Sequence, residues 1–284
     1  MYKPIVWGSM LISVVVTVKN EVEHMPQLLD SLLLQEKPFE IIVVDANSTD
    51  GTAEIIKDYA KNHEEIKYVS YDQTRGESRN YGVKQAKGDA IAFTDGSCMA
   101  DPNWLHEMRL RLLEDYDIVA GNTMRSGPSG FAKAGRVEVY HKGGDASFPT
   151  CNIAYKKDLF TKIGGFDPWF KEAEDVDINF RALDSGAKMF YEPKAVIHHK
   201  GSETHTSFIK KSFWYGFGRR ELDMRHNSLW PHYNVFDMIK KREGESWWKL
   251  VRLSIAFIGY IYCFLIGGKE EKKEKLRKGN ISKH

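Results

Sequence analysis

Four short strand-like runs, three of them apolar, alternate with segments of helical periodicity in the first hundred residues. The runs lie at residues 11–18, 41–44, 67–70 and 90–94. Continuous β-branched runs are typical of parallel strands covered on both faces, and the helical segments supply the crossovers between them. The alternation therefore predicts an α/β fold with a doubly wound, mainly parallel sheet and helices on both faces.

Polar residues follow three of these runs. The first run ends in Lys19-Asn20-Glu21, the second in a cluster from Asp45 to Gly51, and the fourth in Asp95-Gly96-Ser97-Cys98. Open α/β sheets place ligands at the carboxyl ends of their strands, so this pattern predicts a nucleotide site beside Asp95. No GxGxxG follows the first strand and no GxxxxGK[ST] occurs, which argues against a dinucleotide dehydrogenase and a P-loop enzyme.

The second half of the chain has a looser pattern. The expected elements are a helix at 104–112, a strand near 118–120, a mobile Gly-rich segment at 127–144, a strand at 150–155, a turn at Gly164-Gly165 and a strand at 196–199. The last of these strands ends in His198 and His199, whose side chains point to opposite faces because a strand alternates. Only one of the two imidazoles is therefore expected to reach the site.

Three carboxylates open another predicted helix, at Glu174-Asp175-Val176-Asp177, whose inward face would carry Val176, Phe180 and Leu183. The helix dipole stabilises acidic residues in a first turn, so capping is one explanation for them. Three in four residues exceed that need, because unpaired like charges repel each other. The cluster is therefore a candidate functional site as well.

Charge and cysteine content restrict the function classes. The 41 basic residues nearly balance the 39 acidic ones, giving a net charge of +2, so no overall field favours a nucleic-acid partner. The three cysteines are far apart, which fits a reduced compartment better than a disulfide framework. The amino terminus has no signal-peptide pattern, so we expect a cytoplasmic protein.

The stretch 254–268 is uncharged and mostly apolar, yet shorter than the roughly 20 residues that a spanning helix needs. Trp247, Trp248 and Arg252 precede it and a basic tail follows. Such flanks favour a peripheral helix in the interface of the cytoplasmic membrane leaflet. The alternative is a helix packed on the main domain with a solvated tail.

Six segments, in order from about Ile12 to Gly201, resemble the inverting glycosyltransferases of family 2. The segments are the opening strand with Asn20-Glu21, VVDANSTDGT (43–52), RGESRNYGVKQAKGD (75–89), FTDGSC (93–98), CNIAYKKDLFTKIGGFD (151–167) and EDVDINFR (174–181). The resemblance implies a GT-A domain over residues 1–225, with a donor half at about 1–100 and an acceptor half at about 101–225. A C-terminal helical, membrane-docking segment with a basic tail would occupy 226–284.

The resemblance also implies the reaction and its partners. A nucleoside-diphosphate sugar would be the donor, UDP-linked in preference to GDP-linked, and a glycan or lipid-linked molecule the acceptor. The QxxRW motif of processive synthases is absent, which favours transfer of a single sugar. The residues matched to the donor site are Thr17, Asn20, Glu21, Asp45, Arg75, Arg79, Asp95 and Gly96.

A divalent cation, Mg²⁺ or Mn²⁺, would neutralise the diphosphate, with Asp95, Ser97 and His199 as the matched ligands. Two positions depart from the family. Ser97 stands where a second carboxylate is usual, which puts metal dependence in question, and Lys19 stands where tyrosine is common. For Asp95 and Asp45, a structural role in capping a turn is the alternative.

The acceptor side is matched to Gly164, Gly165 and Glu174, with Asp175 as the general base. An inverting displacement needs one carboxylate near the attacking oxygen, and Glu174 beside Asp175 would raise its pKa. Asp177 is expected to cap the helix or to form a salt bridge.

Two other functions remain open from the sequence. A nucleotidyltransferase would need a Gly-rich basic loop after the first strand, which Lys19-Asn20-Glu21-Val22 does not supply. A sugar-nucleotide-binding scaffold without activity would be compatible with Ser97, but would not need the acidic pair at 174–175.

Overall fold

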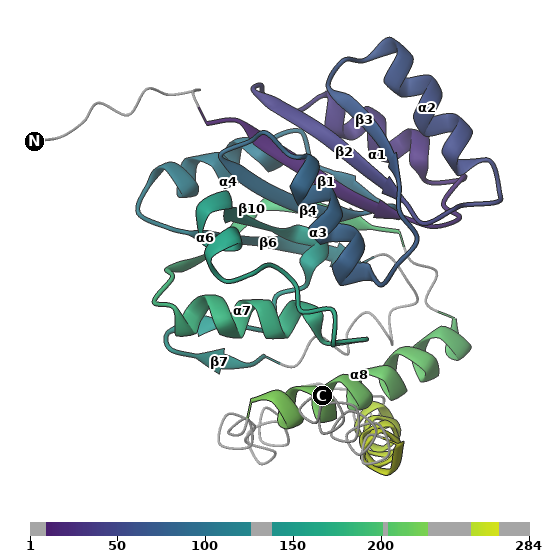
Figure 1. Cartoon of the computed structure of the whole chain (residues 1–284), viewed down its shortest axis with the longest axis vertical. Coiled ribbons are helices and arrows are strands. Elements are labelled where there is room, and N and C mark those ends of the chain that lie inside the picture. The colour runs from purple at the N-terminus through teal and green to yellow at the C-terminus, as the bar shows by residue number, and fades with distance from the viewer. Residues whose placement is uncertain (1–9, 126–137, 201–203, 227–250, 267–284) are drawn as a thin grey trace, which may run out of the picture. The chain divides into compact units, whose positions relative to one another are not determined.

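The structure is a computed structural model that describes residues 10–125, 138–200, 204–226 and 251–266 (Figure 1). The chain separates into two compact units, described in turn. The first unit is built on an eight-stranded sheet of order β3-β2-β1-β4-β9-β6-β10-β5. Its strands are β1 (Ile12–Val18), β2 (Phe39–Asp45), β3 (Ile66–Ser70), β4 (Ala90–Asp95), β5 (Cys98–Ala100), β6 (Ile118–Arg125), β9 (Ile153–Lys156) and β10 (Met189–His199).

The sheet is mainly parallel. β1 pairs in parallel with both β2 and β4, and β2 with β3, whereas β9 runs antiparallel between β4 and β6. The register sets Thr17 opposite Asp95 and Val18 opposite Asp45. The carboxyl ends of β1, β2 and β4 therefore meet at one edge of the sheet, as the sequence predicts.

Helices cover both faces of the sheet, so two apolar layers form. α1 (Met25–Leu33), α2 (Thr52–Asn62) and α4 (Trp104–Leu113) pack on one face, with Val14 and Val16 of β1. α3 (Arg75–Gln85), α6 (Lys157–Lys162) and α7 (Glu174–Asp184) pack on the other, with Val15. Each layer takes alternate residues of the same strand because strand side chains alternate between faces. This confirms the predicted α/β fold.

Local sequence accounts for several helix boundaries. Thr74 and Glu77 form a reciprocal capping box that starts α3, since each side chain accepts from the other residue's backbone N–H. In α1 the buried positions Leu28, Leu29 and Leu32 recur at helical spacing. Truncating one such leucine to alanine costs roughly 2–5 kcal/mol in a well-packed core.

Some elements differ from the sequence-based expectation. The predicted strand at 150–155 begins with a 3₁₀ turn at Thr150–Asn152, and only Ile153–Lys156 pairs in the sheet. The reason is Asn152, whose buried amide accepts from Trp104 Nε1 and donates to the Ala195 carbonyl. These bonds hold the backbone out of the ladder.

Three short strands have no clear sequence signal. They are β5 and a two-stranded sheet of β7 (Tyr140–His141) and β8 (Gly144–Asp145) at the end of the Gly-rich segment. Residues 127–137 of that segment lie outside the described residues. In α7 the prediction that Val176 faces inward is wrong: Ile178 is fully buried, while Val176 is only partly buried.

The second unit contains α8 (His205–Arg225), the helix of residues 251–266 and the segment Phe170–Ala173. Its two helices meet at glycines: a Cβ on Gly216 would lie 1.6 Å from the Ala256 carbonyl oxygen, and one on Gly259 1.9 Å from that of Phe213. No side chain fits at either position, which explains the close backbone contact.

The helix of residues 251–266 agrees with the helix predicted at 254–268, whose last two residues lie outside the description. Within the described chain, no helix is long and apolar enough to cross a membrane. The boundary predicted after residue 225 remains a prediction, although α8 belongs to the same compact unit as the helix of residues 251–266.

Candidate active site

The candidate site lies where β1, β2 and β4 end. Asn20 follows β1 with a left-handed backbone (φ 56°), and its side-chain oxygen accepts from the Thr49 backbone N–H at 2.9 Å. Its own N–H donates to Ser48 Oγ at 2.8 Å. These bonds connect the loop after β1 to the loop after β2, so the two predicted nucleotide-binding loops support each other. Thr17 is partly buried in β1, directly opposite Asp95.

Asp45 ends β2 and is 1% exposed. Its Oδ1 accepts from the Ser48 backbone N–H at 3.2 Å and from Ser48 Oγ at 2.5 Å, and its Oδ2 accepts from the Tyr68 hydroxyl at 3.2 Å. The carboxylate therefore shapes the turn, which is the structural role that the sequence left open. Donor contact through Asp45 stays a prediction.

Gly96 gives the loop after β4 its close contact with the loop after β1. A Cβ at Gly96 would lie 2.9 Å from both Glu21 Cγ and Val18 Cγ1. Glu21 is also held by His24, whose Nδ1 lies 3.0 Å from its carboxylate. A side chain at position 96 would push these loops apart, so glycine is required for this arrangement.

Arg79 lies at the centre of the charged residues and is 4% exposed. Its Nη2 donates to Asp95 Oδ1 at 3.0 Å and its Nη1 to Glu174 Oε1 at 2.9 Å. Burial alone would lower the pKa of Arg79, but the charges of Asp95 and Glu174 outweigh it and raise the pKa above the ordinary value. The guanidinium thus joins the end of β4 to the start of α7.

Glu174 and Asp175 form the first turn of α7. Glu174 is 5% exposed, and its Oε2 has no hydrogen-bond partner in the part of the chain that the structure describes. Burial first, and the charge of Glu174 second, raise the pKa of Asp175 to about 7. A carboxyl group with such a pKa is half ionised near neutral pH and can accept a proton there.

Arg75, at the start of α3, is mostly exposed, and its Nε lies 3.6 Å from Glu174 Oε1. The structure thus brings Arg75, Arg79, Asp95, Glu174 and Asp175 into one charged group. Its arrangement joins the predicted donor half to the predicted acceptor half.

Gly164 and Gly165 form the predicted turn after α6, with φ values of 83° and 67°. Arg181 of α7 fixes this turn, because its guanidinium donates to the carbonyls of Ile163 and Gly165 at 2.6 and 2.7 Å. Arg181 also pairs with Asp177, which confirms the predicted salt bridge.

Asn80 supports the same turn from α3, since its amide exchanges two hydrogen bonds with the Phe166 backbone. Sequence analysis missed Asn80 and Arg181 as supports of the site. Both lie in the resembling segments RGESRNYGVKQAKGD and EDVDINFR, but their partners are distant in the chain.

Ser97 and His199 are close in the sheet, because His199 pairs with Cys98 and the Lys200 N–H donates to the Ser97 carbonyl at 2.8 Å. His198 instead contacts Asp101 at 2.9 Å. Among the described residues, no group of three or more His, Cys, Asp or Glu side chains could hold a metal by itself. The site fits a cation held mainly by substrate phosphates, since Mg²⁺ typically takes only one or two carboxylates from the protein.

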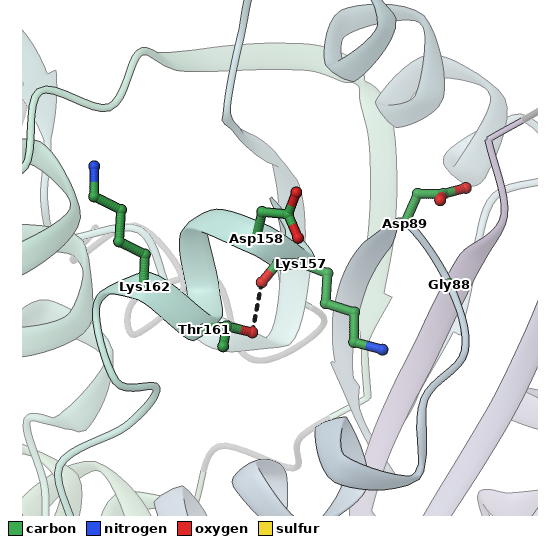
Figure 2. Close-up of a pocket in the computed structure, with 6 residues that line it drawn as sticks. All are labelled: Gly88, Asp89, Lys157, Asp158, Thr161 and Lys162. Carbon is green, nitrogen blue, oxygen red and sulfur yellow. Dashed lines mark hydrogen bonds between the residues drawn. The ribbon is translucent and has the colours of Figure 1, made fainter.

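A hollow of about 550 Å³ lies at the other end of β4 (Figure 2). It is lined by Gly88, Asp89, Lys157, Asp158, Thr161 and Lys162. The ammonium groups of Lys157 and Lys162 point to opposite sides, so they do not converge on one anion. Lys157 Nζ donates to the Ala86 carbonyl at 2.7 Å, and Asp89 accepts from the Leu11 N–H at 3.0 Å. These side chains hold the fold together, and the hollow is not the candidate site.

A mainly parallel sheet with helices on both faces and carboxylates at its carboxyl edge is the arrangement of the GT-A glycosyltransferases, although other nucleotide-binding α/β proteins share it. The profile described as glycosyl transferase family 2 matches residues 13–171. The chain belongs to this family, and it is a glycosyltransferase enzyme.

Relatives and solved structures agree with this assignment. Glycosyltransferase AglE of Haloferax volcanii is 25% identical over 283 residues, covering 88% of this chain and 91% of that protein. A glucosyl-dolichyl phosphate glucuronosyltransferase of the same organism is 26% identical over 245 residues, covering 75% of this chain and 77% of that protein.

Two solved structures share the fold. The mannosyltransferase PcManGT from Pyrobaculum calidifontis, in complex with GDP-Man and Mn²⁺, has a TM-score of 0.61 at 18% identity, covering 95% of this chain and 79% of that chain. Residues 1–349 of S. aureus TarS, in complex with UDP-GlcNAc, have a TM-score of 0.58 at 21% identity, covering 75% and 67%. At these identities the likeness concerns the fold.

Proposed function

We propose that this glycosyltransferase transfers one sugar with inversion of configuration, using Asp175 as the general base. The observation that carries the proposal is the position of Asp175: it opens α7 beside Glu174, with its pKa raised to about 7, and Glu174 is tied through Arg79 to Asp95. At neutral pH such a carboxyl group is ionised in about half of the molecules, and in these it can accept the proton of the attacking hydroxyl group.

The reaction is a single displacement. The acceptor hydroxyl oxygen forms a bond to the anomeric carbon of the donor while the bond from that carbon to the diphosphate oxygen breaks. The hydroxyl proton passes to the Asp175 carboxylate, and the nucleoside diphosphate leaves with the bonding electron pair. Because attack comes from the side opposite the leaving group, the configuration at the anomeric carbon inverts.

Glu174 is proposed to bind the acceptor or the transferred sugar. Its buried Oε2 has no hydrogen-bond partner in the described chain, and a hydroxyl group of a sugar would satisfy it. Arg79 acts indirectly in this account, because its guanidinium already pairs with Asp95 and Glu174. It would hold the two carboxylates at a fixed separation and balance their charge.

Asp95, with Ser97 and His199 as weaker candidates, would hold Mg²⁺ or Mn²⁺ together with the donor diphosphate. The cation would neutralise charge that develops on the leaving group. The Mn²⁺ in the GDP-Man complex of PcManGT, a protein of the same fold, supports the use of a divalent cation.

A UDP sugar is the first candidate donor, as the family resemblance implies, and a GDP sugar the second. Each has a precedent in a protein of this fold, since TarS binds UDP-GlcNAc and PcManGT binds GDP-Man. The proposed donor contacts are those matched in the sequence, apart from Arg79, which acts through Asp95 and Glu174: Thr17, Asn20, Glu21, Asp45, Arg75, Asp95 and Gly96. Gly164 and Gly165 are proposed to line the acceptor side, since their turn is held to α7 by Arg181.

We further propose a lipid-linked acceptor, reached at the cytoplasmic face of a membrane. The relative named as acting on glucosyl-dolichyl phosphate supports this class of acceptor. The helix of residues 251–266 supports membrane contact, because it exposes Phe257, Ile258, Phe264 and Leu265 by 56–65%. Exposed apolar side chains grouped on one helix are typical of surfaces that bind partners or membranes.

The test of the proposal is the Asp175→Asn variant. Asparagine keeps the shape of the side chain but cannot accept the proton, so sugar transfer should fall by about 100-fold or more. The affinity for the donor nucleotide with Mn²⁺, measured by calorimetry, should change little. An Asp175→Asn enzyme with full transfer activity would show that another group is the base.

A further inference from the structure

Helix α8 holds the short segment that leads into the base-bearing helix. The segment Phe170–Ala173 comes directly before Glu174, the first residue of α7, and belongs to the same compact unit as α8. Glu221 of α8 is 3% exposed. Its carboxylate accepts hydrogen bonds from the backbone N–H of Lys171, at 3.2 and 3.3 Å, and of Glu172, at 3.1 Å.

Neighbouring positions on α8 contact the same segment. A Cβ at Gly218 would lie 3.1 Å from Ala173 Cβ, so glycine lets the segment pass close to the helix. At the end of α8, the His226 ring stacks on Phe170, with 6.5 Å between ring centroids. Gly218 and Glu221 are three residues apart and therefore share one face of the helix.

Burial of Glu221 costs solvation free energy, and packing alone does not require a carboxylate at this position. Desolvation raises the pKa of Glu221 to about 7, although both backbone hydrogen bonds lower it. An ionised carboxylate is, however, the strongest acceptor available for two adjacent backbone N–H groups. The Glu221 carboxylate thus loses contact with water and binds two consecutive backbone N–H groups instead.

We propose that Glu221 is a positioning residue for sugar transfer: by holding Lys171 and Glu172, it fixes the chain three residues before Asp175. The inference rests on the proposed function, because it takes Asp175 as the base. Efficient transfer requires the base to be placed within a fraction of an ångström of the attacking oxygen. The restraint on Glu172 reaches Asp175 through the backbone, because only Ala173 separates Glu172 from the first turn of α7.

The test compares Glu221→Ala with Glu221→Gln in the full chain. Alanine removes both hydrogen bonds, whereas the glutamine oxygen, placed at the position of Oε2, can still accept from both Lys171 and Glu172. Hydrogen exchange at the two amides should become faster by about tenfold or more in the alanine variant and change little in the glutamine variant.

A second readout follows Asp175 itself. The side-chain carboxyl carbon of ¹³C-labelled Asp175, assigned by its loss in Asp175→Asn, should titrate near pH 7 in the native enzyme. In Glu221→Ala the midpoint should fall by about one pH unit, because a first turn of α7 that is no longer held in place exposes its own carboxylate to water. Glu221→Gln should restore the native midpoint. This readout needs neither donor nor acceptor.

The control is Ser212→Ala, which removes another buried polar group of α8. Its hydroxyl bonds within the helix, to the Phe208 carbonyl, so the exchange and the titration should both stay native. If Glu221→Ala does not fold, Gly218→Ala keeps the carboxylate and presses on Ala173, and the same two changes are expected.

A folded Glu221→Ala variant with native exchange or a native Asp175 midpoint would overturn the inference. Failure of the proposed function would look different. Asp175→Asn would then retain sugar transfer, while the exchange and titration results for Glu221 would stand on their own.

Discussion

Arg79 connects the two halves of the site through ion pairs that are far apart in sequence. Its partner Asp95 lies 16 residues away and its partner Glu174 lies 95 residues away. Both carboxylates and the arginine belong to segments that the sequence singled out, but nothing in their spacing shows that they meet. Only the packing of α7 and α3 on the same face of the sheet brings them together.

Arg79→Ala should therefore destabilise the fold strongly. The substitution leaves Glu174 as a buried carboxylate without its main partner, which costs roughly 3–5 kcal/mol. Urea unfolding monitored by circular dichroism measures the change. Arg75→Ala is the matched control, because its side chain is 57% exposed, and it should cost less than about 1 kcal/mol. Equal losses for both variants would contradict the bridging role of Arg79.

Asp175 should give the reaction its pH dependence. Its pKa is raised, so the base is protonated and inactive at low pH, and kcat/KM should rise with pH, reach half its maximum near pH 7 and level off above that. With an ordinary aspartate the half-maximum would lie near pH 4 instead. The measurement is kcat/KM across pH 5–9 at constant ionic strength. A flat profile over this range would show that the group that accepts the proton is already ionised at pH 5.

At the scale of elements, periodicity predicted most of the helices and strands. β1, β2 and β4 are apolar runs that end in polar residues, and these features are local in sequence. β5, β7 and β8 have only two or three residues each and owe their pairing to tertiary contacts. Asn152 shows the same limit, since its partners Trp104 and Ala195 interrupt a strand that the local sequence favours.

The helix of residues 251–266 exposes apolar side chains to solvent and packs through Gly259 against α8. A double variant, Phe257→Ser with Phe264→Ser, should weaken binding to vesicles of phosphatidylcholine and phosphatidylglycerol by about tenfold or more. Each phenylalanine contributes roughly 1–2 kcal/mol when buried in the interface.

Sedimentation with vesicles measures this binding. The control is Leu34→Ser, because Leu34 is 74% exposed but lies at the end of α1 in the other unit. It should bind as the native protein does. Native binding by the phenylalanine double variant would remove the support for membrane contact through this helix.

At the scale of the whole molecule, the fold and the family followed from motifs in register, whereas the roles of individual side chains did not. Asp45 illustrates why, because both of its oxygens already bond within the loop and to Tyr68. A motif specifies that an aspartate is needed at the end of β2, but not whether it binds a ligand or shapes the loop that does.

Nucleotide binding should stabilise the whole chain. A ligand present at about 100 times its Kd adds roughly 2.7 kcal/mol, which raises the Tm of a protein of this size by about 5 °C. We expect such a shift with UDP plus Mn²⁺, a smaller one without Mn²⁺, and little with CDP or dTDP. If GDP were the one nucleotide that raised the Tm, the donor would be a GDP sugar. Equal shifts with and without Mn²⁺ would show that nucleotide binding does not depend on a metal.

The most direct test of the account is the configuration of the product. With the donor selected by the nucleotide panel, the one-bond carbon–hydrogen coupling at the anomeric carbon, measured by NMR, distinguishes α from β linkages in both donor and product. Single displacement with Asp175 as the base predicts that an α-linked donor gives a β-linked product. A product that retains the donor configuration would contradict direct attack by the acceptor and the role assigned to Asp175.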